Sequence, residues 1–174
     1  MSVARYRMFA AYNAWANRRL YDAVAALPEA EYRADRGAFF KSLEGTLNHI
    51  VIADQLWLAR FLDAPPPYTE LTGIVRDDFA SLRALREAED ARIIAYADSL
   101  TPADLNRRFS YRTITNPATV EQDLAPALDH FFNHQTHHRG QAHGILTNLG
   151  HDAPSLDLVY FQRESGFGGI KRLD

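Results

Sequence analysis

The residues from about Ser42 to Leu62 are apolar almost all the way round the helix that their spacing predicts, and this constrains the fold most. The apolar positions are Leu43, Leu47, Ile50, Val51, Ile52, Leu56, Trp57, Leu58 and Phe61. A helix with no polar face is packed against neighbours on several sides. The chain must therefore supply other elements that surround this segment.

Three further segments carry apolar residues at helical spacing. They run over about residues 3–27, 77–99 and 124–149. Pro28 follows the first, where a proline cannot continue the helix, and Gly150 follows the last as a stop signal. Four long helices joined by loops of moderate length predict a helical bundle.

Two parts of the chain lie outside these helices. Residues 101–104 predict the start of a short helix, and residues 107–117 alternate and are rich in Thr, Tyr and Phe, which favours an extended segment or hairpin. The tail, residues 151–174, carries enough apolar residues to pack on the body. We therefore predict an all-α fold: a four-helix bundle with a short extra helix or extended segment between helices 3 and 4 and a C-terminal tail packed on the bundle. We expect the 174 residues to form a single domain, 1–174.

The amino-acid composition limits the classes of partner and the types of metal ligand that this chain can have. The net charge is −3, the chain has no cluster of Lys and Arg, and lysine occurs only at Lys41 and Lys171, so we expect no nucleic-acid partner. No apolar run approaches the roughly 18 residues that a membrane-spanning helix needs. The first twenty residues are too polar for a signal peptide, so we expect a cytoplasmic protein. Cysteine is absent, so any metal must be held by His, Asp, Glu or water.

Most of the histidines fall in one short stretch, HFFNHQTHHRGQAH, at residues 130–143. His134 and His138 are four residues apart, which on a helix stacks two imidazoles on one face, one turn apart. Both belong to the apolar side of their helix and should point into the bundle. His130 and His137 lie about a quarter-turn away, toward solvent or a subunit contact. Two neutral imidazoles in this geometry are half of a first-row metal site.

The alternative is that His134 and His138 are core histidines satisfied by neighbouring protein groups. Each buried imidazole must find hydrogen-bond partners, and finding them twice in adjacent turns is harder than sharing one cation. A protease-type His-Glu-x-x-His motif is excluded, because Gln135 follows His134 where that motif has its glutamate.

A metal site needs at least a third protein ligand. The candidates are His49 and Asp54 on the apolar helix, and Glu121 or Asp129 near the start of the last helix. His49 and Asp54 both lie among apolar residues, so each needs a partner. Asp54 could orient an imidazole N–H or could pair with an arginine.

The chain resembles the DinB-like family of damage-inducible, metal-dependent four-helix-bundle proteins. The resemblance rests on YNAWAN at 12–17, FFKSLEGTLNHIVIADQLWL at 39–58, HFFNHQTHHRGQAHGILTNLG at 130–150 and PSLDLVYF at 154–161. It implies a divalent metal, zinc or nickel above all, bound by three histidines. Carried over to this chain, the ligands are His49, His134 and His138. It also implies a homodimer.

The residues around His138 have roles of their own. Arg139 and Gln141 could bind a carboxylate or a group that orients a ligand, or could form a surface ion pair. Gly140 would permit close approach of another helix.

Three neutral histidines leave the metal's charge in place and a coordination position open, which is typical of reactive sites. Relatives that the family resemblance brings in include thiol-dependent transferases and an isomerase. We therefore predict a metalloenzyme that acts on a small molecule with a low-molecular-weight thiol. A metal-dependent hydrolase and a non-catalytic, stress-induced metal- or ligand-binding protein are the alternatives.

Overall fold

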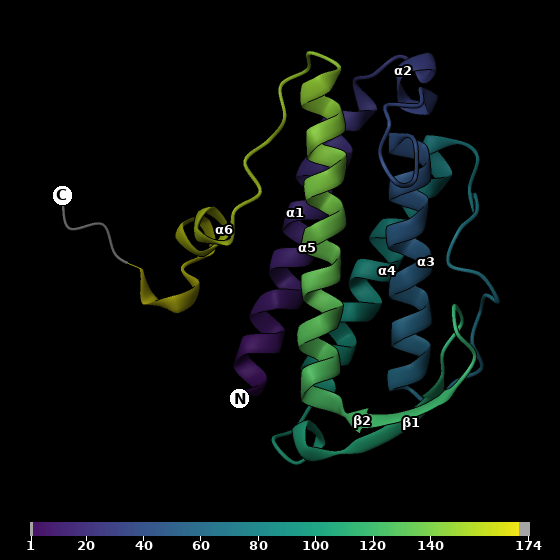
Figure 1. Ribbon diagram of the computed structural model, residues 1–174. Coiled ribbons are helices and arrows are strands. Elements are labelled where there is room, and N and C mark those ends of the chain that lie inside the picture. Colours follow the sequence, from purple (N-terminus) through teal and green to yellow (C-terminus); the bar gives the residue numbers. More distant parts are fainter. Residues whose placement is uncertain (1, 171–174) are drawn as a thin grey trace.

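The computed structural model describes residues 2–170. Four long helices run side by side along most of the molecule: α1 (Val3–Ala25), α3 (Leu43–Phe61), α4 (Phe79–Ser99) and α5 (Leu124–Asn148) (Figure 1). Helix α1 packs against α4 and α5, and α3 packs against the same two helices. The apolar helix of the sequence is α3, and almost all of its predicted apolar positions are buried between its neighbours.

The shorter elements complete the described chain. Helix α2 (Glu29–Arg33) precedes α3, the 3-10 turn η1 (Asp104–Asn106) follows α4, and strands β1 (Arg108–Arg112) and β2 (Thr119–Asp123) form a two-stranded antiparallel sheet. Helix α6 (Leu158–Ser165) and the 3-10 turn η2 (Phe167–Gly169) close it. The protein is mostly helical, as predicted, and the segment predicted as extended or hairpin contributes the first strand of a two-stranded hairpin, so the fold is not purely α-helical.

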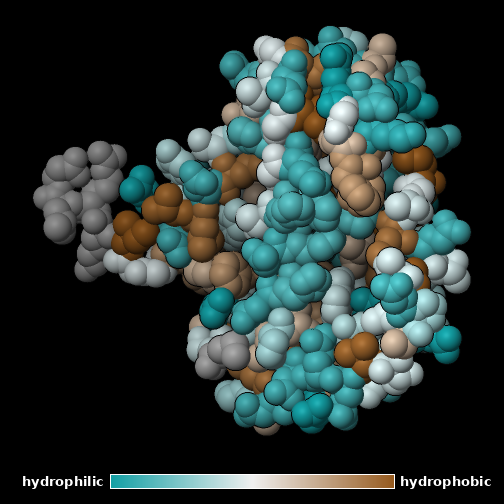
Figure 2. All heavy atoms as spheres, viewed as in Figure 1, coloured by the Kyte–Doolittle hydropathy of each residue, from teal (hydrophilic) through white to brown (hydrophobic). Residues whose placement is uncertain are grey.

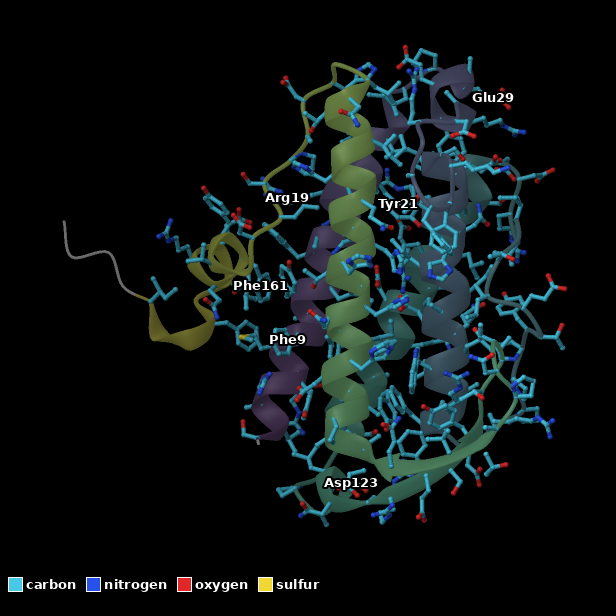
Figure 3. The ribbon with its side chains drawn as sticks, in the orientation of Figure 1. Phe9, Arg19, Tyr21, Glu29, Asp123 and Phe161 are labelled. Carbon is cyan, nitrogen blue, oxygen red and sulfur yellow. The ribbon has the colours of Figure 1, made fainter. Side chains whose placement is uncertain are left out.

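The helix boundaries follow local signals. The side chain of Ser42 accepts a hydrogen bond from the Gly45 N–H, 3.1 Å away, and so caps α3. Asp78 caps α4 in the same way through the Ser81 N–H. Gly150 has a φ of +84°, the left-handed conformation that ends α5 as the sequence predicts. Strand β2 runs directly into α5 at Asp123 (Figure 3).

A polar layer divides the bundle core in two. One apolar cluster contains Tyr6, Phe61 and Ile93, and the other contains Leu20, Leu47 and Ile145. Between them every long helix contributes buried polar side chains: Asn13, Asn17, Asp54, Arg86, Asp90, Gln135 and Arg139. We call these seven residues the polar layer. Buried polar groups need partners, so this layer fixes how the four helices are aligned.

The C-terminal segment packs on the bundle through few residues. Phe161 of α6 is buried against Tyr12 and Trp15 of α1, and Figure 3 shows it between the two helices. Glu164 of α6 also accepts a hydrogen bond from Nε1 of Trp15 at 2.7 Å. The exposed apolar side chains of α6 and η2 colour part of the projecting arm in Figure 2 brown. The packing prediction holds for Phe161, and the last part of the predicted tail, residues 171–174, lies outside the described residues. None of the helices within residues 2–170 combines the length and the apolar character that a membrane crossing requires.

Candidate metal centre

Helices α3 and α5 bring the three predicted site residues together. The ring of His49 lies 5.3 Å from that of His134 and 4.5 Å from that of His138, measured between ring centroids. The rings of His134 and His138 are 4.3 Å apart, as their one-turn spacing on α5 requires. One ring nitrogen from each residue lies within 4.8 Å of the other two, a grouping that could hold a metal ion.

Protein acceptors orient two of the three rings. The Nδ1 of His49 lies 2.7 Å from the carbonyl oxygen of Leu71, and the Nδ1 of His138 lies 2.8 Å from Oε1 of Gln141. An oxygen of this kind can only accept, so each Nδ1 carries the proton and donates it. Each Nε2 is then left with its lone pair free. A hydrogen bond from the far ring nitrogen to a carbonyl or amide oxygen is the usual support of a metal-binding histidine.

The Nε2 atoms of His134 and His138 face one another at 3.0 Å. Because His138 already carries its proton on Nδ1, the two Nε2 atoms can share only a proton from His134 or a cation. Nitrogen–zinc bonds of about 2.0–2.1 Å in a tetrahedral site put neighbouring ligand nitrogens about 3.3 Å apart. The observed separation therefore fits a shared divalent ion.

The three imidazoles are neutral at neutral pH. Burial, and to a smaller extent His138, lower the pKa of His49 to about 4, against the hydrogen bond to Leu71, which raises it. Burial and the neighbouring imidazoles lower the pKa of His134 to about 3. Burial also lowers the pKa of His138, against the hydrogen bond from its Nδ1 to Gln141, which raises it. A neutral imidazole is the form that coordinates a metal.

The histidine triad has an aromatic ring on one side and a cavity on another. The ring of Phe40 stacks on His49 at 3.9 Å with an angle of 18° between the planes, and it meets the ring of His138 at 5.5 Å. His49 and His134 also line a cavity of about 460 Å³ whose other walls come from α3, the loop after it, and the β1–β2 hairpin. A small molecule could therefore reach these imidazoles from the cavity.

The other candidate ligands are engaged elsewhere. Asp54 accepts a hydrogen bond from Nη1 of Arg86 at 2.6 Å, so of its two predicted roles the arginine pair is the one found. Glu121 forms an ion pair with Arg108 at 3.0 Å across the hairpin. Asp129 lies 3.4 Å from an arginine of α1. His130 and His137 are exposed, as predicted.

The roles predicted for the three residues that follow His138 differ from those that the structure shows. Gln141 contacts His138 directly through its Oε1, 2.8 Å from Nδ1, rather than binding a carboxylate or a separate orienting group as predicted. Arg139 is only 2% exposed and donates to the side-chain oxygens of Asn13 and Asn17, so the predicted carboxylate or surface ion pair is wrong. Gly140 faces open space, since a Cβ there would meet nothing within 4 Å, so the predicted close helix approach is also wrong.

Sequence reasoning missed the Leu71 carbonyl and the Phe40 ring. Leu71 lies in the long connection between α3 and α4, and a backbone oxygen leaves no signature in the sequence. Phe40 belongs to the FFKS string before α3, where two adjacent phenylalanines could have drawn attention; Phe39 is 81% exposed while Phe40 turns toward His49.

Comparison with known proteins identifies the family of this chain. The DinB family model matches residues 1–170. The chain belongs to the DinB family. Among curated proteins, Protein DinB of Bacillus subtilis (strain 168) is 24% identical over 163 residues, covering 84% of this chain and 87% of the relative. The family resemblance predicted from the sequence is thus confirmed over residues 1–170.

Proposed function

We propose that this DinB-family protein binds one divalent cation through His49, His134 and His138 and uses it to act on a small molecule. The observation that carries the proposal is the commitment of the Nδ1 atoms of His49 and His138 to protein acceptors. This leaves the Nε2 lone pairs of both residues free, with the Nε2 of His134 3.0 Å from that of His138. Zinc and nickel suit an all-imidazole site of this kind.

The residues of the chain would do the following. His49, His134 and His138 hold the ion without neutralising its charge, since all three are neutral. Phe40 covers one side of the triad and excludes water there. The cavity beside His49 and His134 leaves room for a reactant. A dication held there supplies Lewis acidity, which lowers the pKa of a thiol or a water that it coordinates.

We favour a thiol-dependent transferase or isomerase over a hydrolase. Within residues 2–170, neither aspartate nor glutamate lines the cavity beside the triad, so a carboxylate base for hydrolysis is lacking there. A thiolate needs no such base once its proton has left. In a transfer reaction its sulfur would attack an electrophilic carbon, the carbon–sulfur bond would form, and the leaving group would depart with its electron pair.

Elemental analysis tests the metal proposal on protein that was never exposed to a nickel column. We expect about one zinc or nickel per chain in the unmodified protein and none retained by His138→Ala. Full occupancy in His138→Ala would refute the ligand assignment.

Turnover assays test the chemistry on the metal-loaded protein. Cysteine or glutathione with monobromobimane would be compared with nitrophenyl ester hydrolysis. Thiol conjugation that depends on His138 supports the proposal, ester hydrolysis alone supports the hydrolase, and an intact metal site without either activity supports the non-catalytic binding protein. The homodimer and the cytoplasmic location stay predictions from the sequence; sedimentation equilibrium measures the former.

A further inference from the structure

The cavity beside the histidine triad has one permanent charge in its lining. Arg60, near the end of α3, is the only arginine or lysine among the described residues that line it, and none of the lining residues is acidic. Its volume of about 460 Å³ falls within the range of about 300–1,000 Å³ that is typical of small-molecule sites. The cavity therefore presents a positive charge to whatever enters it.

The Arg60 guanidinium has no anionic partner in the described chain. Within residues 2–170 its side chain forms neither an ion pair nor a hydrogen bond, although it is half-buried. The two buried arginines of the polar layer, Arg86 and Arg139, both have side-chain partners. A partly desolvated guanidinium with free N–H groups is suited to receive a carboxylate or another oxyanion, which it can bind through two parallel hydrogen bonds.

Two aromatic rings hold this guanidinium in place. Its Cζ lies 4.6 Å from the ring centroid of Trp57 and 4.5 Å from that of Tyr111, in the angle of 62° between the two rings. Contact with ring faces restricts the side chain and leaves its N–H edge for a ligand. The same rings give the cavity an apolar wall, against which the body of a ligand could pack.

We propose that this cavity binds a small molecule that carries a carboxylate or similar oxyanion on an apolar body, with the anion on Arg60 and the body directed toward the histidine triad. The inference rests on the proposed function for the role of the triad, but the anion site itself depends on Arg60, Trp57 and Tyr111. It makes Arg60 a specificity-determining residue: among otherwise similar compounds, the acid should be preferred to its neutral amide.

Trp57 provides a direct measurement, because it stands in the cavity wall. The other tryptophan, Trp15, packs against α6, and Trp15→Phe would leave Trp57 as the reporter. In that background, phenylacetate and phenylacetamide would be titrated against zinc-loaded protein and against protein stripped of metal. We expect phenylacetate to bind about tenfold more tightly than the amide in both forms, as a charge-assisted hydrogen bond allows.

Variants assign the preference to one residue. Arg60→Gln should bring the two affinities to within about threefold, and Arg60→Lys should retain part of the preference because it keeps the charge but loses the bidentate edge. Arg112→Gln is the matched control: it removes an exposed arginine from β1, next to Tyr111 but outside the cavity, and should leave the preference unchanged.

The outcomes separate this inference from the metal proposal. A preference that persists in Arg60→Gln, or none at all in the unmodified cavity, overturns the inference. A preference found only with zinc and surviving Arg60→Gln means that the ion binds the carboxylate, which leaves the metal proposal intact and the inference wrong. An Arg60-dependent preference in a protein that fails to bind zinc would support the inference while refuting the proposed function.

Discussion

Two groups of buried polar side chains lie in the middle of this molecule, and they differ in how their hydrogen-bonding atoms are satisfied. In the polar layer each of the seven side chains has at least one partner within the layer. Asp54 accepts from Arg86 at 2.6 Å and from Gln135 at 2.9 Å, and Asp90 accepts from Asn13 at 3.1 Å. Carboxylate, guanidinium and amide groups are thus paired with one another, although Nε of Arg86, Nε of Arg139 and Oε1 of Gln135 have no hydrogen-bond partner among the described residues.

In the histidine triad, the hydrogen bonds to other protein groups are made by the Nδ1 atoms of His49 and His138, which point away from the centre of the triad. His49 and His138 donate outward to Leu71 and Gln141, while the Nε2 atoms of His134 and His138 face each other at 3.0 Å. The polar layer joins all four long helices, whereas the triad joins only α3 and α5. The comparison indicates that the polar layer aligns the four helices. The triad instead has ring nitrogens that could bind a ligand such as a metal ion.

Burial alone would lower the pKa of the Arg86 guanidinium, but the carboxylates of Asp90 and Asp54 raise it above its ordinary value. The charged pair is therefore the state that the fold favours. Removing Asp54 would leave Arg86 with Asp90 alone, whose Oδ1 lies 3.0 Å from Nη2.

The largest effect should come from breaking the polar layer. Asp54→Ala leaves a buried guanidinium short of its partner, and we expect it to lower the free energy of unfolding by about 3–5 kcal/mol in urea denaturation. Asp22→Ala is the control, because Asp22 pairs with Arg83 on the surface and should cost less than about 1 kcal/mol. Equal costs for the two substitutions would show that the layer does not stabilise the alignment of the helices.

Zinc should stabilise the folded protein by binding to the histidine triad, and it should not stabilise a variant in which the triad is incomplete. At a free zinc concentration about 100 times the dissociation constant, we expect the free energy of unfolding to rise by about 3 kcal/mol. Thermal or urea denaturation with and without EDTA measures it. His49→Ala should remove the gain; the same gain in that variant would place the ion elsewhere.

Gln141 should strengthen zinc binding indirectly, by orienting the ring of His138. Gln141→Leu removes the acceptor that holds the His138 Nδ1–H, and we expect zinc affinity to fall by about 10–100-fold in a competition titration with a chelating dye. Gln141→Glu keeps an acceptor and should retain most of the affinity. An unchanged affinity in Gln141→Leu would mean that helix packing alone orients the ring.

Acid should weaken the metal-free protein through the triad. The pKa values of His49 and His134 in the folded state, about 4 and about 3, lie below their ordinary value of 6.5. Below pH 6.5 the unfolded chain therefore binds protons that the folded chain does not, and stability falls as the pH drops from 6.5 toward 4. The midpoint of urea denaturation should fall over this range, and less steeply in a His49→Asn, His134→Asn double variant. Identical slopes would assign the acid sensitivity to other groups.

The smallest effect should come from the neighbour of the triad. His137 is exposed, with its ring 4.8 Å from that of His138 but outside the group of three. His137→Ala should keep the metal in elemental analysis and change the free energy of unfolding by no more than about 0.5 kcal/mol. Loss of metal from this variant would show that the ligands lie in another register of α5.

Much of the fold could be predicted because helical signals are local. The bounds predicted for the four long helices lie within about two residues of those found, since prolines, caps and Gly150 act on the turn beside them. Helices α2 and α6 were missed because each is short and has little periodicity to detect. The hairpin register, with Phe109 opposite Gln122, needed two strands to be aligned in space.

The candidate site likewise has a part that local sequence determines and a part that depends on the tertiary structure. The sequence determines that His134 and His138 lie on one face of one helix, because four residues make about one turn whatever surrounds it. That His49 is their companion came from the family resemblance, while the residue pattern left Asp54, Glu121 and Asp129 open. Only the tertiary structure excludes these three, by giving each carboxylate an arginine. It alone also brings Leu71 and Phe40 beside the imidazoles and places Arg60 in the wall of the same cavity. The reason is physical: distances within a helix follow from the backbone, whereas distances between helices depend on how all the side chains pack together.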